Sequence, residues 1–459
     1  MANTQCEISN SFCGYIGIAE ADMTPPAGIY LGNWGASTSP VATGIHRPLH
    51  MTCVTFQSNQ KEKPLVLLGF DLGWWKDRND ELILRNEILE ACGLTPDRLL
   101  ICLSHTHAGP STCRKDVHQP GGELIEPYLN KIKNVAVDSI KKAVSKAKKS
   151  LLSWAYGQCG LAKNRDLKDP GKNRYLVGYN PEKKADDTLL CGRITNESGQ
   201  ITATIVNYAC HPTTLGWENT LISPDYIGAM RETIRETMGI PSLFIQGASG
   251  DLAPLLQYSG DTELADGHGR QLGYAVLSTL ESMTAPGTVP VFDGVVESGA
   301  PLAIWNEIPE TVSNACVPVK RDIRYLLKDF PDYAELETVW RDTNDPVTKE
   351  RLWRKMGIRA GIGDGDETVI AVWIWKLGGA YLVVHPNEAY SVFQEMIRAS
   401  YPGIPVVVGN LVNGSIGYFP PKDLYDQDLY AVWQTPFAAG CLEVLIKDTL
   451  RELKHLEKK

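Results

Sequence analysis

A short apolar run that ends in two histidines is the feature that most narrows the fold of this chain. Leu99–Leu103 is continuously apolar and predicts a buried strand, and the following Ser-His-Thr-His-Ala segment breaks at Gly109-Pro110. In extended backbone, residues two apart point the same way, so His105 and His107 are expected to face one pocket. The carboxyl ends of strands are where α/β proteins place ligand sites, and neutral imidazole is a common zinc ligand. Two unrelated surface histidines in a loop remain the alternative.

The rest of the chain alternates strand-like and helix-like segments, which is typical of an α/β fold with mixed sheets and flanking helices. Strands are expected at residues 14–19, 51–56, 64–70, 99–103, 151–156, 189–194, 201–208, 243–246, 288–302, 368–384 and 405–409. Helices are expected at 125–149, 226–238, 269–283 and 435–456, with a helical insertion near 307–360. No internal repeat or low-complexity linker divides the sequence, so residues 1–459 are expected to form a single domain.

Composition argues against several classes of partner. The 459 residues carry a net charge of −9, and no long basic run stands out beyond the mixed Lys141–Lys149 stretch, so nucleic acid is not expected. No run reaches the roughly 18–20 apolar residues of a membrane span, and the polar Met1–Asn10 stretch is unlike a secretory leader. The 11 cysteines are scattered without a Cys-x-x-Cys pair, which favours free thiols. We therefore expect a cytoplasmic protein that acts on a small molecule.

Four strand-like runs lead into a side chain that can bind a metal. These side chains are His105 with His107 beside it, His211, Glu388 and Tyr418. Each lies close to a Gly or Pro, where the chain is expected to leave a sheet. Two imidazoles, a carboxylate and a phenolate or water would make a zinc shell. The separations along the chain are too long for a local metal motif, and a packed core tyrosine at position 418 is the alternative.

Several blocks resemble the neutral, non-lysosomal ceramidase family and occur in the family's order over residues 14–430. The most specific is Ser104–Pro110, which is similar to the family signature Thr-His-Thr-His-Ser-Gly-Pro. The other blocks are Ala19–Pro26, Asn164-Arg165, Asn207–Thr213, Gly250–Pro254, Asn387-Glu388 and Asn413–Tyr418. The resemblance implies a ceramidase-like catalytic domain and an amidase with one catalytic zinc.

The resemblance also implies roles for particular residues. The zinc ligands would be His105, His211, Glu388 and Tyr418. His107 and Arg165 would line the reacting carbonyl, and Tyr425 would supply a further hydroxyl donor. Zinc lowers the pKa of bound water from about 15.7 towards 7, so a hydroxide nucleophile is expected at neutral pH. His107 would carry its proton to the leaving amine, and Arg165 would stabilise the oxyanion unless it pairs with a surface carboxylate such as Asp166.

The sequence departs from the family pattern at three places. Asn387 stands before Glu388 where the family has Gly, and Ala108 replaces the signature serine. The chain ends in a helix soon after Tyr418, so it resembles the shorter bacterial members that lack the C-terminal immunoglobulin-like domain. These departures favour an N-acyl amide of small or medium size over ceramide.

Aromatic residues near the predicted site leave the bond type open. Tryptophans that neighbour the predicted site loops are Trp34, Trp74, Trp75 and Trp217. Tryptophan faces suit sugar rings as well as acyl chains, although ordinary burial explains them equally. Hydrolysis of an ester or a glycosidic bond at the same metal is therefore an alternative, and so is a metal- or ligand-binding protein without catalysis.

Overall fold

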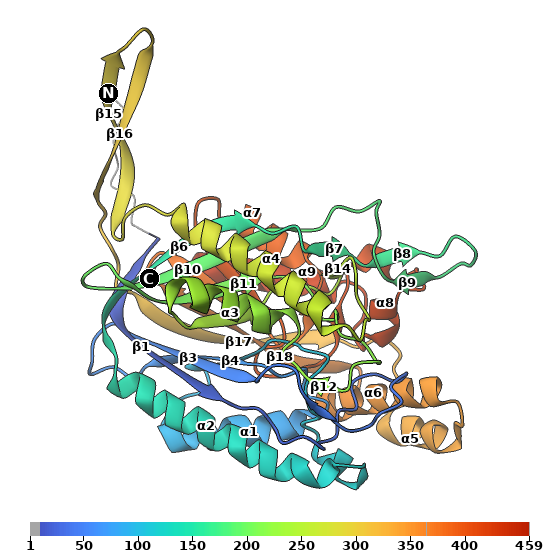
Figure 1. The fold of residues 1–459 in the computed structure, drawn as a ribbon. Coiled ribbons are helices and arrows are strands. Elements are labelled where there is room, and N and C mark those ends of the chain that lie inside the picture. Colours follow the sequence, from blue (N-terminus) through green and yellow to red (C-terminus); the bar gives the residue numbers. More distant parts are fainter. Residues whose placement is uncertain (1–9, 364, 459) are drawn as a thin grey trace.

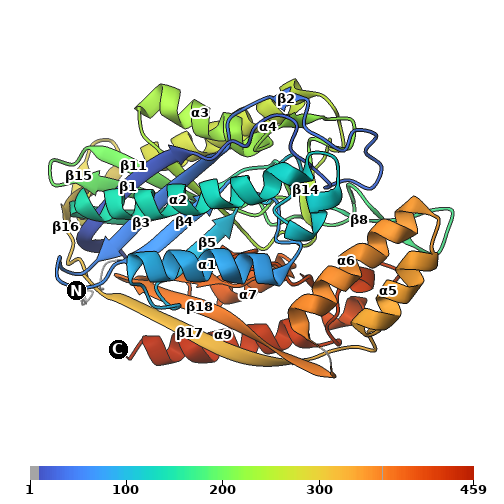
Figure 2. The ribbon, with the colours of Figure 1, turned by 90° about the horizontal axis from the view of Figure 1, so that it is seen from below.

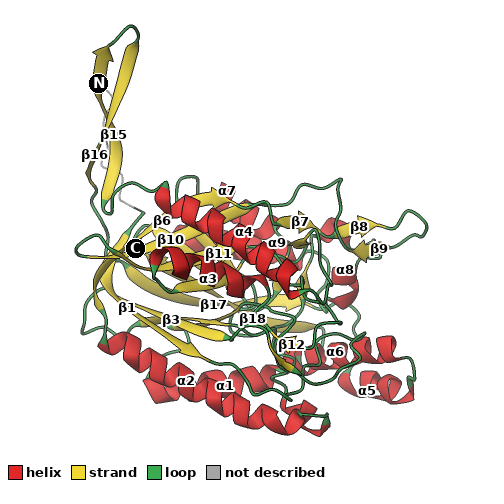
Figure 3. Ribbon diagram, viewed as in Figure 1, coloured by secondary structure: helices red, strands yellow, loops and turns green. Residues whose placement is uncertain are grey.

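Two β-sheets stacked face to face organise the fold. This computed structural model describes residues 10–363 and 365–458, so most of the polar Met1–Asn10 stretch lies outside the described residues. Helices cover the outer face of each sheet, which gives four layers in the order helices, large sheet, small sheet, helices (Figures 1 and 2). The predicted α/β class with mixed sheets and flanking helices is confirmed (Figure 3).

The larger sheet has eight strands, and most neighbours run antiparallel. Its strands are β1 (Phe12–Asp22), β3 (His50–Gln57), β4 (Leu65–Phe70), β5 (Leu99–Leu103), β6 (Lys148–Gln158), β10 (Thr188–Asn196), β11 (Ile201–Tyr208) and β13 (Ser242–Gln246). Their order across the sheet is β13-β11-β10-β6-β1-β3-β4-β5. Only the β4–β5 and β11–β13 pairs of this sheet are parallel. The two parallel pairs therefore lie at opposite edges.

The smaller sheet has four strands and packs its apolar face on the larger sheet. Its strands are β17 (Cys316–Leu326), β18 (Glu367–Leu377), β19 (Ala380–Val384) and β21 (Val406–Gly409), in the order β17-β18-β19-β21. Buried Trp373 and Trp375 of β18 lie in the same apolar cluster as Phe12 and Phe56 of the larger sheet. The two indole N–H groups donate to loop carbonyls at 2.9 and 2.8 Å, so this burial leaves no indole donor unpaired.

Six longer helices complete the two outer layers. Those over the large sheet are α1 (Arg78–Cys92), α2 (Ile125–Ser145), α3 (Tyr226–Met238) and α4 (Thr262–Glu281); those over the small sheet are α7 (Val392–Ala399) and α9 (Cys441–Leu456). On α2, the buried residues Tyr128, Ile132, Ala136 and Ile140 recur every four positions, which is the apolar stripe that its sequence predicts. None of the helices in the described part of the chain has the length and apolarity of a membrane span.

The expected helical insertion is shorter than the sequence indicates. Only α5 (Tyr333–Asp342) and α6 (Pro346–Ile362) are helical, while residues 301–309 form β16 and residues 316–326 form β17. The charged residues of β17 alternate with buried Ile323 and Tyr325, so the charge marks the solvent side of a strand. An Asp332–Glu335 capping box begins α5.

Short elements connect the layers. Paired short strands are β2 (Gly44–Ile45) with β12 (Leu221–Ile222), β7 (Ala162–Asn164) with β14 (Leu252–Pro254), β8 (Asp166–Lys168) with β9 (Tyr175–Val177), and β20 (Glu388–Ala389) with β22 (Tyr418–Phe419). A one-turn helix, α8 (Tyr430–Gln434), follows β22. The long hairpin of β15 (Thr288–Glu297) and β16 (Pro301–Pro309) projects from the body of the protein (Figure 1).

Candidate metal centre

The predicted metal-binding residues gather where strands of both sheets end. His105 follows β5, and His211 follows β11, both in the large sheet. Glu388 begins β20 after β19 of the small sheet, and Tyr418 lies directly opposite it because β20 and β22 pair in parallel. Two of the four predicted ligands therefore follow strands of the large sheet, and the other two lie on the β20–β22 pair.

His105 is held by its backbone and by one ring nitrogen. Its φ is 69°, in the left-handed region that non-glycine residues rarely adopt, so the extended backbone assumed from the sequence is not what orients it. Its N–H donates to the Leu72 carbonyl at 2.8 Å, and Nδ1 lies 3.1 Å from the Gly73 carbonyl. Because a carbonyl can only accept, Nδ1 carries the proton and Nε2 keeps a free lone pair.

His211 is oriented in the same manner. Its Nδ1 lies 2.7 Å from the Ser249 carbonyl, which again assigns the proton to Nδ1. Burial, reinforced by the nearby Arg165 guanidinium, lowers the pKa of His211 to about 3. The imidazole is therefore neutral, and its Nε2 is an available metal ligand.

Four ligand atoms surround one point. The Oε2 atom of Glu388 is 3.0 Å from His211 Nε2 and 3.4 Å from His105 Nε2, and the Tyr418 hydroxyl is 3.5 Å from His211 Nε2. A tetrahedral zinc with bonds of about 2.0–2.2 Å separates its ligand atoms by about 3.3–3.6 Å. A carboxylate oxygen and two imidazole nitrogens gathered at one point form a set of ligand atoms that fits a cation.

Burial keeps Tyr418 protonated in the absence of a cation. Burial and the neighbouring Glu388 carboxylate raise the pKa of Tyr418 well above its ordinary value. Arg165 opposes this effect: its Nη2 lies 3.1 Å from the Tyr418 hydroxyl, and its Nε and Nη2 donate to the Gly250 carbonyl. Arg165 is thus fixed against Tyr418 and does not line the cavity in front of the histidines.

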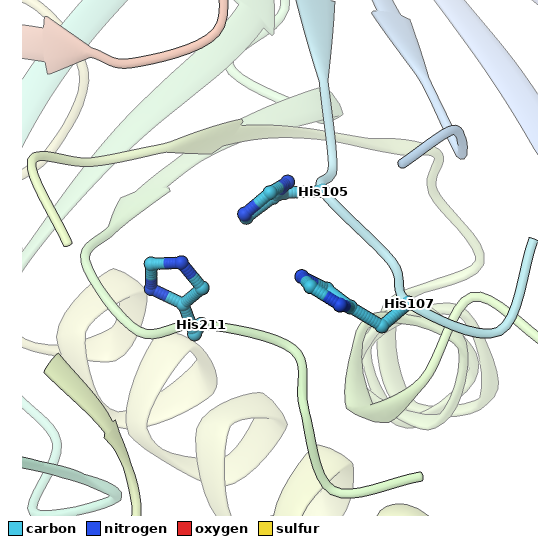
Figure 4. Close-up of side chains that lie close together, drawn as sticks. All are labelled: His105, His107 and His211. Atoms are coloured by element: carbon cyan, nitrogen blue, oxygen red, sulfur yellow. The ribbon is translucent and has the colours of Figure 1, made fainter. Parts of the chain in front are cut away.

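His107 shares the centre but is held differently. The ligand nitrogens of His105, His107 and His211 lie within 4.8 Å of one another (Figure 4). Neither nitrogen of His107 has a hydrogen-bond partner among the described residues. Its ring lies against Trp34 and Trp74, with ring centroids 5.1 and 4.9 Å away. The expectation that both histidines of the motif face one pocket agrees with this arrangement.

Tyr425 lies apart from the group. Its ring is close to Thr435 and Cys441, and it is not among the residues that line the cavity at the histidines. Besides the predicted ligand Tyr418, the tyrosine that lines this cavity is Tyr430 of α8, not Tyr425. The spacing of the tyrosine block could not distinguish these two residues.

A cavity opens in front of His105 and His107. Its apolar lining includes Trp74, Trp75, Trp353 and Ile358, and Lys76 and Arg354 bring positive charge to it. The sequence analysis did not identify Lys76, Arg354 and Tyr430 as residues of the site. Lys76 could have been found from its place directly after the strand-end Gly-Trp-Trp segment, but nothing distinguishes Arg354 from the other charged residues of α6.

Other histidines and acids near the centre support its loops. The Asp251 carboxylate accepts from the Ser391 backbone N–H at 2.7 Å and the Ser391 hydroxyl at 3.0 Å. Asp71 pairs with buried Arg231 at 2.9 Å. His385 packs against Phe393, with ring centroids 5.1 Å apart. These residues hold the backbone around the ligands.

Comparison with known proteins assigns the chain to a family. The family model described as neutral/alkaline non-lysosomal ceramidase, N-terminal, matches residues 15–257, more than half of the chain. A neutral ceramidase from Pseudomonas aeruginosa has a similar structure, with a TM-score of 0.67 and 16% identity over 95% of this chain and 73% of that one. A ceramidase complexed with C2 gives a TM-score of 0.65 and 16% identity over 95% of this chain and 74% of that one.

No curated protein matches the sequence. At 16% identity, the two solved structures show a similar fold and no more. The assignment to a family rests on the family model. The residues matched by the family model include His105, His107, Arg165 and His211. Glu388 and Tyr418 lie outside the matched range, and the fold brings them next to these histidines. From motif, fold and family model together, the chain belongs to the neutral/alkaline non-lysosomal ceramidases, a family of hydrolases.

Proposed function

We propose that this protein is a zinc-dependent hydrolase that cleaves an N-acyl amide bond in a small or medium-sized molecule. The observation that carries the proposal is the convergence of His105 Nε2, His211 Nε2 and Glu388 Oε2, with Oε2 within 3.4 Å of both nitrogens. Ordered carbonyls fix the tautomer of both histidines, as they do in metal sites generally. Family membership supports hydrolysis, and the name of the relatives supports an amide as the bond.

The residues around the ligands have separate tasks in this proposal. When bound, the metal would lower the pKa of a coordinated water towards 7. His107 takes a proton from the attacking water and delivers it to the leaving amine, because both of its ring nitrogens are free. Arg165 favours the anionic form of Tyr418, which suits Tyr418 to binding a cation.

His107 is better placed as a proton carrier than as a ligand. No carbonyl orients its ring, whereas His105 and His211 each have one. Its ring centroid is also 6.2 Å from that of His211, compared with 4.7 Å between His105 and His211. Burial and the two neighbouring histidines lower the pKa of His107 well below its ordinary value, so its resting ring is neutral and one of its two nitrogens has a free lone pair. Tyr425 has no role here because it lies away from the cavity.

Metal analysis and a substrate panel test this function together. Protein purified without added metal is expected to contain about one zinc per chain, and a chelator should abolish activity that zinc restores. The panel contrasts N-acyl amides with the matching esters and with glycosides, and the amides are expected to be turned over fastest. A protein that takes up no zinc contradicts the metal. Turnover of glycosides alone favours the sugar alternative, for which the tryptophans of the cavity are the structural reason.

A further inference from the structure

The cavity in front of the metal ligands has a second polar end, and that end is positive. Lys76 follows the Trp74-Trp75 segment at the end of β4, and Arg354 comes from α6 of the helical insertion. Both side chains line the cavity, and both lie near the ring of Trp74. The Trp74 ring centroid is 4.9 Å from that of His107, 5.5 Å from the Arg354 guanidinium carbon and 6.0 Å from Lys76 Nζ. One indole ring therefore links the two ends.

Lys76 is buried with spare hydrogen-bonding capacity. Its side chain is only 3% exposed, and Nζ donates to the Gly32 carbonyl at 2.7 Å. The closest carboxylate oxygen, from Asp116, is 3.5 Å away. Aromatic rings occupy much of the remaining surroundings, with Trp353 and Tyr30 centred 5.2 and 5.6 Å from Nζ. Burial lowers the pKa of Lys76, and the Asp116 carboxylate opposes this effect. Because the Gly32 carbonyl and Asp116 are the acceptors near its three donors, one donor is left for a further acceptor.

Arg354 is held firmly in place. Its Nε donates to Glu350 at 2.9 Å, Nη2 to the Asn33 carbonyl at 3.0 Å, and Nη1 to the Tyr430 hydroxyl at 3.3 Å. Three partners on three separate segments fix the plane of the guanidinium without a ligand. A pre-positioned guanidinium binds a planar oxyanion at low entropic cost.

The balancing carboxylates lie outside this cavity. Asp116 and Glu350 line a neighbouring pocket, which Lys76 borders as well, whereas Arg354 lines the cavity at the histidines. The one carboxylate that does line the cavity, Glu388, belongs to the metal ligands. A neutral acyl chain would cover the Arg354 side chain, which is 21% exposed, without giving its guanidinium a further acceptor, and such desolvation of a charged group costs free energy.

From this arrangement we infer that the substrate is an anionic amide: its acyl bond lies at the histidines while a carboxylate or a similar oxyanion binds Lys76 and Arg354. This inference rests on the proposed hydrolase function and adds a substrate class to it. The short span across Trp74 requires the anion to lie within a few bonds of the amide, as in an N-acyl amino acid. The α5–α6 insertion would thus determine specificity, because it supplies Arg354.

A matched pair of substrates tests the inference. N-acylglycine and N-acylglycinamide with the same acyl chain differ only in the charge of the terminal group, and N-acyltaurine replaces the carboxylate by a sulfonate. The zinc-loaded enzyme is expected to favour N-acylglycine over the amide roughly 10- to 100-fold in kcat/KM, the range expected for charge-assisted hydrogen bonds. A preference shared by N-acyltaurine indicates a general oxyanion site, and a preference confined to N-acylglycine indicates a carboxylate. Equal rates, or a preference for the neutral amide, would overturn the inference.

Variants assign the preference to the two cations. Arg354→Gln and Lys76→Met should each reduce the ratio of the two kcat/KM values about tenfold, and Arg354→Lys should retain part of it. Arg351→Gln is the matched control: it removes one charge from the same helix, but Arg351 is exposed and lies against Trp433. Zinc content and melting temperature verify that each variant is folded. If the control lowers the ratio as much as Arg354→Gln, general electrostatics explains the preference and the inference is wrong.

Binding separates this inference from the proposed function. Calorimetry of the wild type and both variants with N-acylglycine and N-acylglycinamide does not require turnover. If no amide is cleaved but N-acylglycine binds more tightly than the amide and loses this advantage in Arg354→Gln, the hydrolase proposal fails and the anion site stands. If amides are cleaved but the anion gives no advantage in binding or rate, the function stands and the anion site is excluded.

Discussion

Two histidines separated by one residue are held so differently that they should respond oppositely to mutation. His105 has a left-handed backbone and a carbonyl at Nδ1, whereas the ring of His107 has no hydrogen-bond partner among the described residues and packs against neighbouring rings, including those of Trp34 and Trp74. A strained backbone conformation persists only where surrounding contacts stabilise it. Here those contacts fix the position of His105 Nε2. An imidazole that a hydrogen bond fixes in one orientation is suited to binding a metal, and an imidazole without such a hydrogen bond is suited to proton transfer.

His105→Ala is therefore expected to lose zinc, while His107→Ala keeps zinc and loses turnover. A positioned acid–base group is typically worth about 10²–10⁴-fold in rate. Metal analysis and kcat measured on the same preparations check both parts. His118→Ala, at an exposed position, is the control and should change neither quantity. Loss of zinc from His107→Ala with retention in His105→Ala would reverse the two roles.

A buried histidine beside the ligands makes the fold sensitive to acid. Burial lowers the pKa of His385 to about 3, below the value of about 6.5 in the unfolded chain. The unfolded state therefore binds the proton first, so this stability is complete above about pH 6.5 and is lost as the pH falls from there towards 3. At pH 5 the loss from this one group is about 2 kcal/mol.

His385→Gln removes that titration. In urea unfolding at pH 7 and pH 5, with chelator present throughout, the variant should lose about 2 kcal/mol less than the wild type between the two pH values. The other histidines titrate in both proteins and cancel in the difference. His455→Gln, in an exposed position on α9, is the control and should lose as much as the wild type. Equal losses in His385→Gln and the wild type would show that His385 does not contribute.

At the scale of elements, periodicity predicted most helices and strands but failed where charge was the only signal. Helix α2 was identified because burial of one face leaves apolar residues at helical spacing. Strand β5 was identified because burial of both faces leaves a continuous apolar run. Strand β17 was predicted as helix because its solvent face carries the charged residues Lys320, Asp322 and Arg324, while the residues that bury its other face are supplied by α9 and β18. Such tertiary partners are not visible along the sequence.

The projecting β15–β16 hairpin is expected to be dispensable for the site. Its two strands pair mainly with each other, and large side chains such as Phe292 and Trp305 are 55% and 62% exposed. An isolated two-stranded hairpin adds little stability in water. Replacing residues 291–306 by a Gly-Ser turn should leave zinc content and kcat unchanged and shift the melting temperature by only a few degrees. Loss of zinc or of folded protein would show that the hairpin supports the body.

At the scale of the whole molecule, the sequence indicated which residues meet but not how. The blocks around His105, His211, Glu388 and Tyr418 were recognised from their residue types and order, and the structure brings them to one point. The cause is the face-to-face packing of two sheets, which places the ends of β5 and β11 against the β20–β22 pair. Contacts between residues so far apart leave no periodic trace. Arg354, delivered by a helical insertion, was missed for the same reason.

One side chain joins the two sheets immediately before the second histidine. Asn207, fully buried at the end of β11, donates from Nδ2 to the Ile245 carbonyl of the large sheet at 3.1 Å and to the Val408 carbonyl of the small sheet at 2.8 Å. Its Oδ1 accepts from the Val408 N–H at 3.1 Å and from Arg398 at 3.0 Å. The amide thus uses its donors and acceptor to fix the spacing of the sheets that supply the metal ligands.

Asn207→Ala should weaken folding and metal binding together. Four buried groups lose a partner, so the free energy of unfolding is expected to fall by about 2–4 kcal/mol in urea titrations. Because His211 and Glu388 belong to different sheets, a looser junction should also raise the zinc Kd at least tenfold, measured by competition with a chromogenic chelator. Asn130→Ala, on the exposed side of α2, removes the same amide and should change neither quantity. If Asn207→Ala loses stability but keeps the wild-type zinc affinity, each sheet holds its ligands independently, and the site does not depend on how the two sheets are joined.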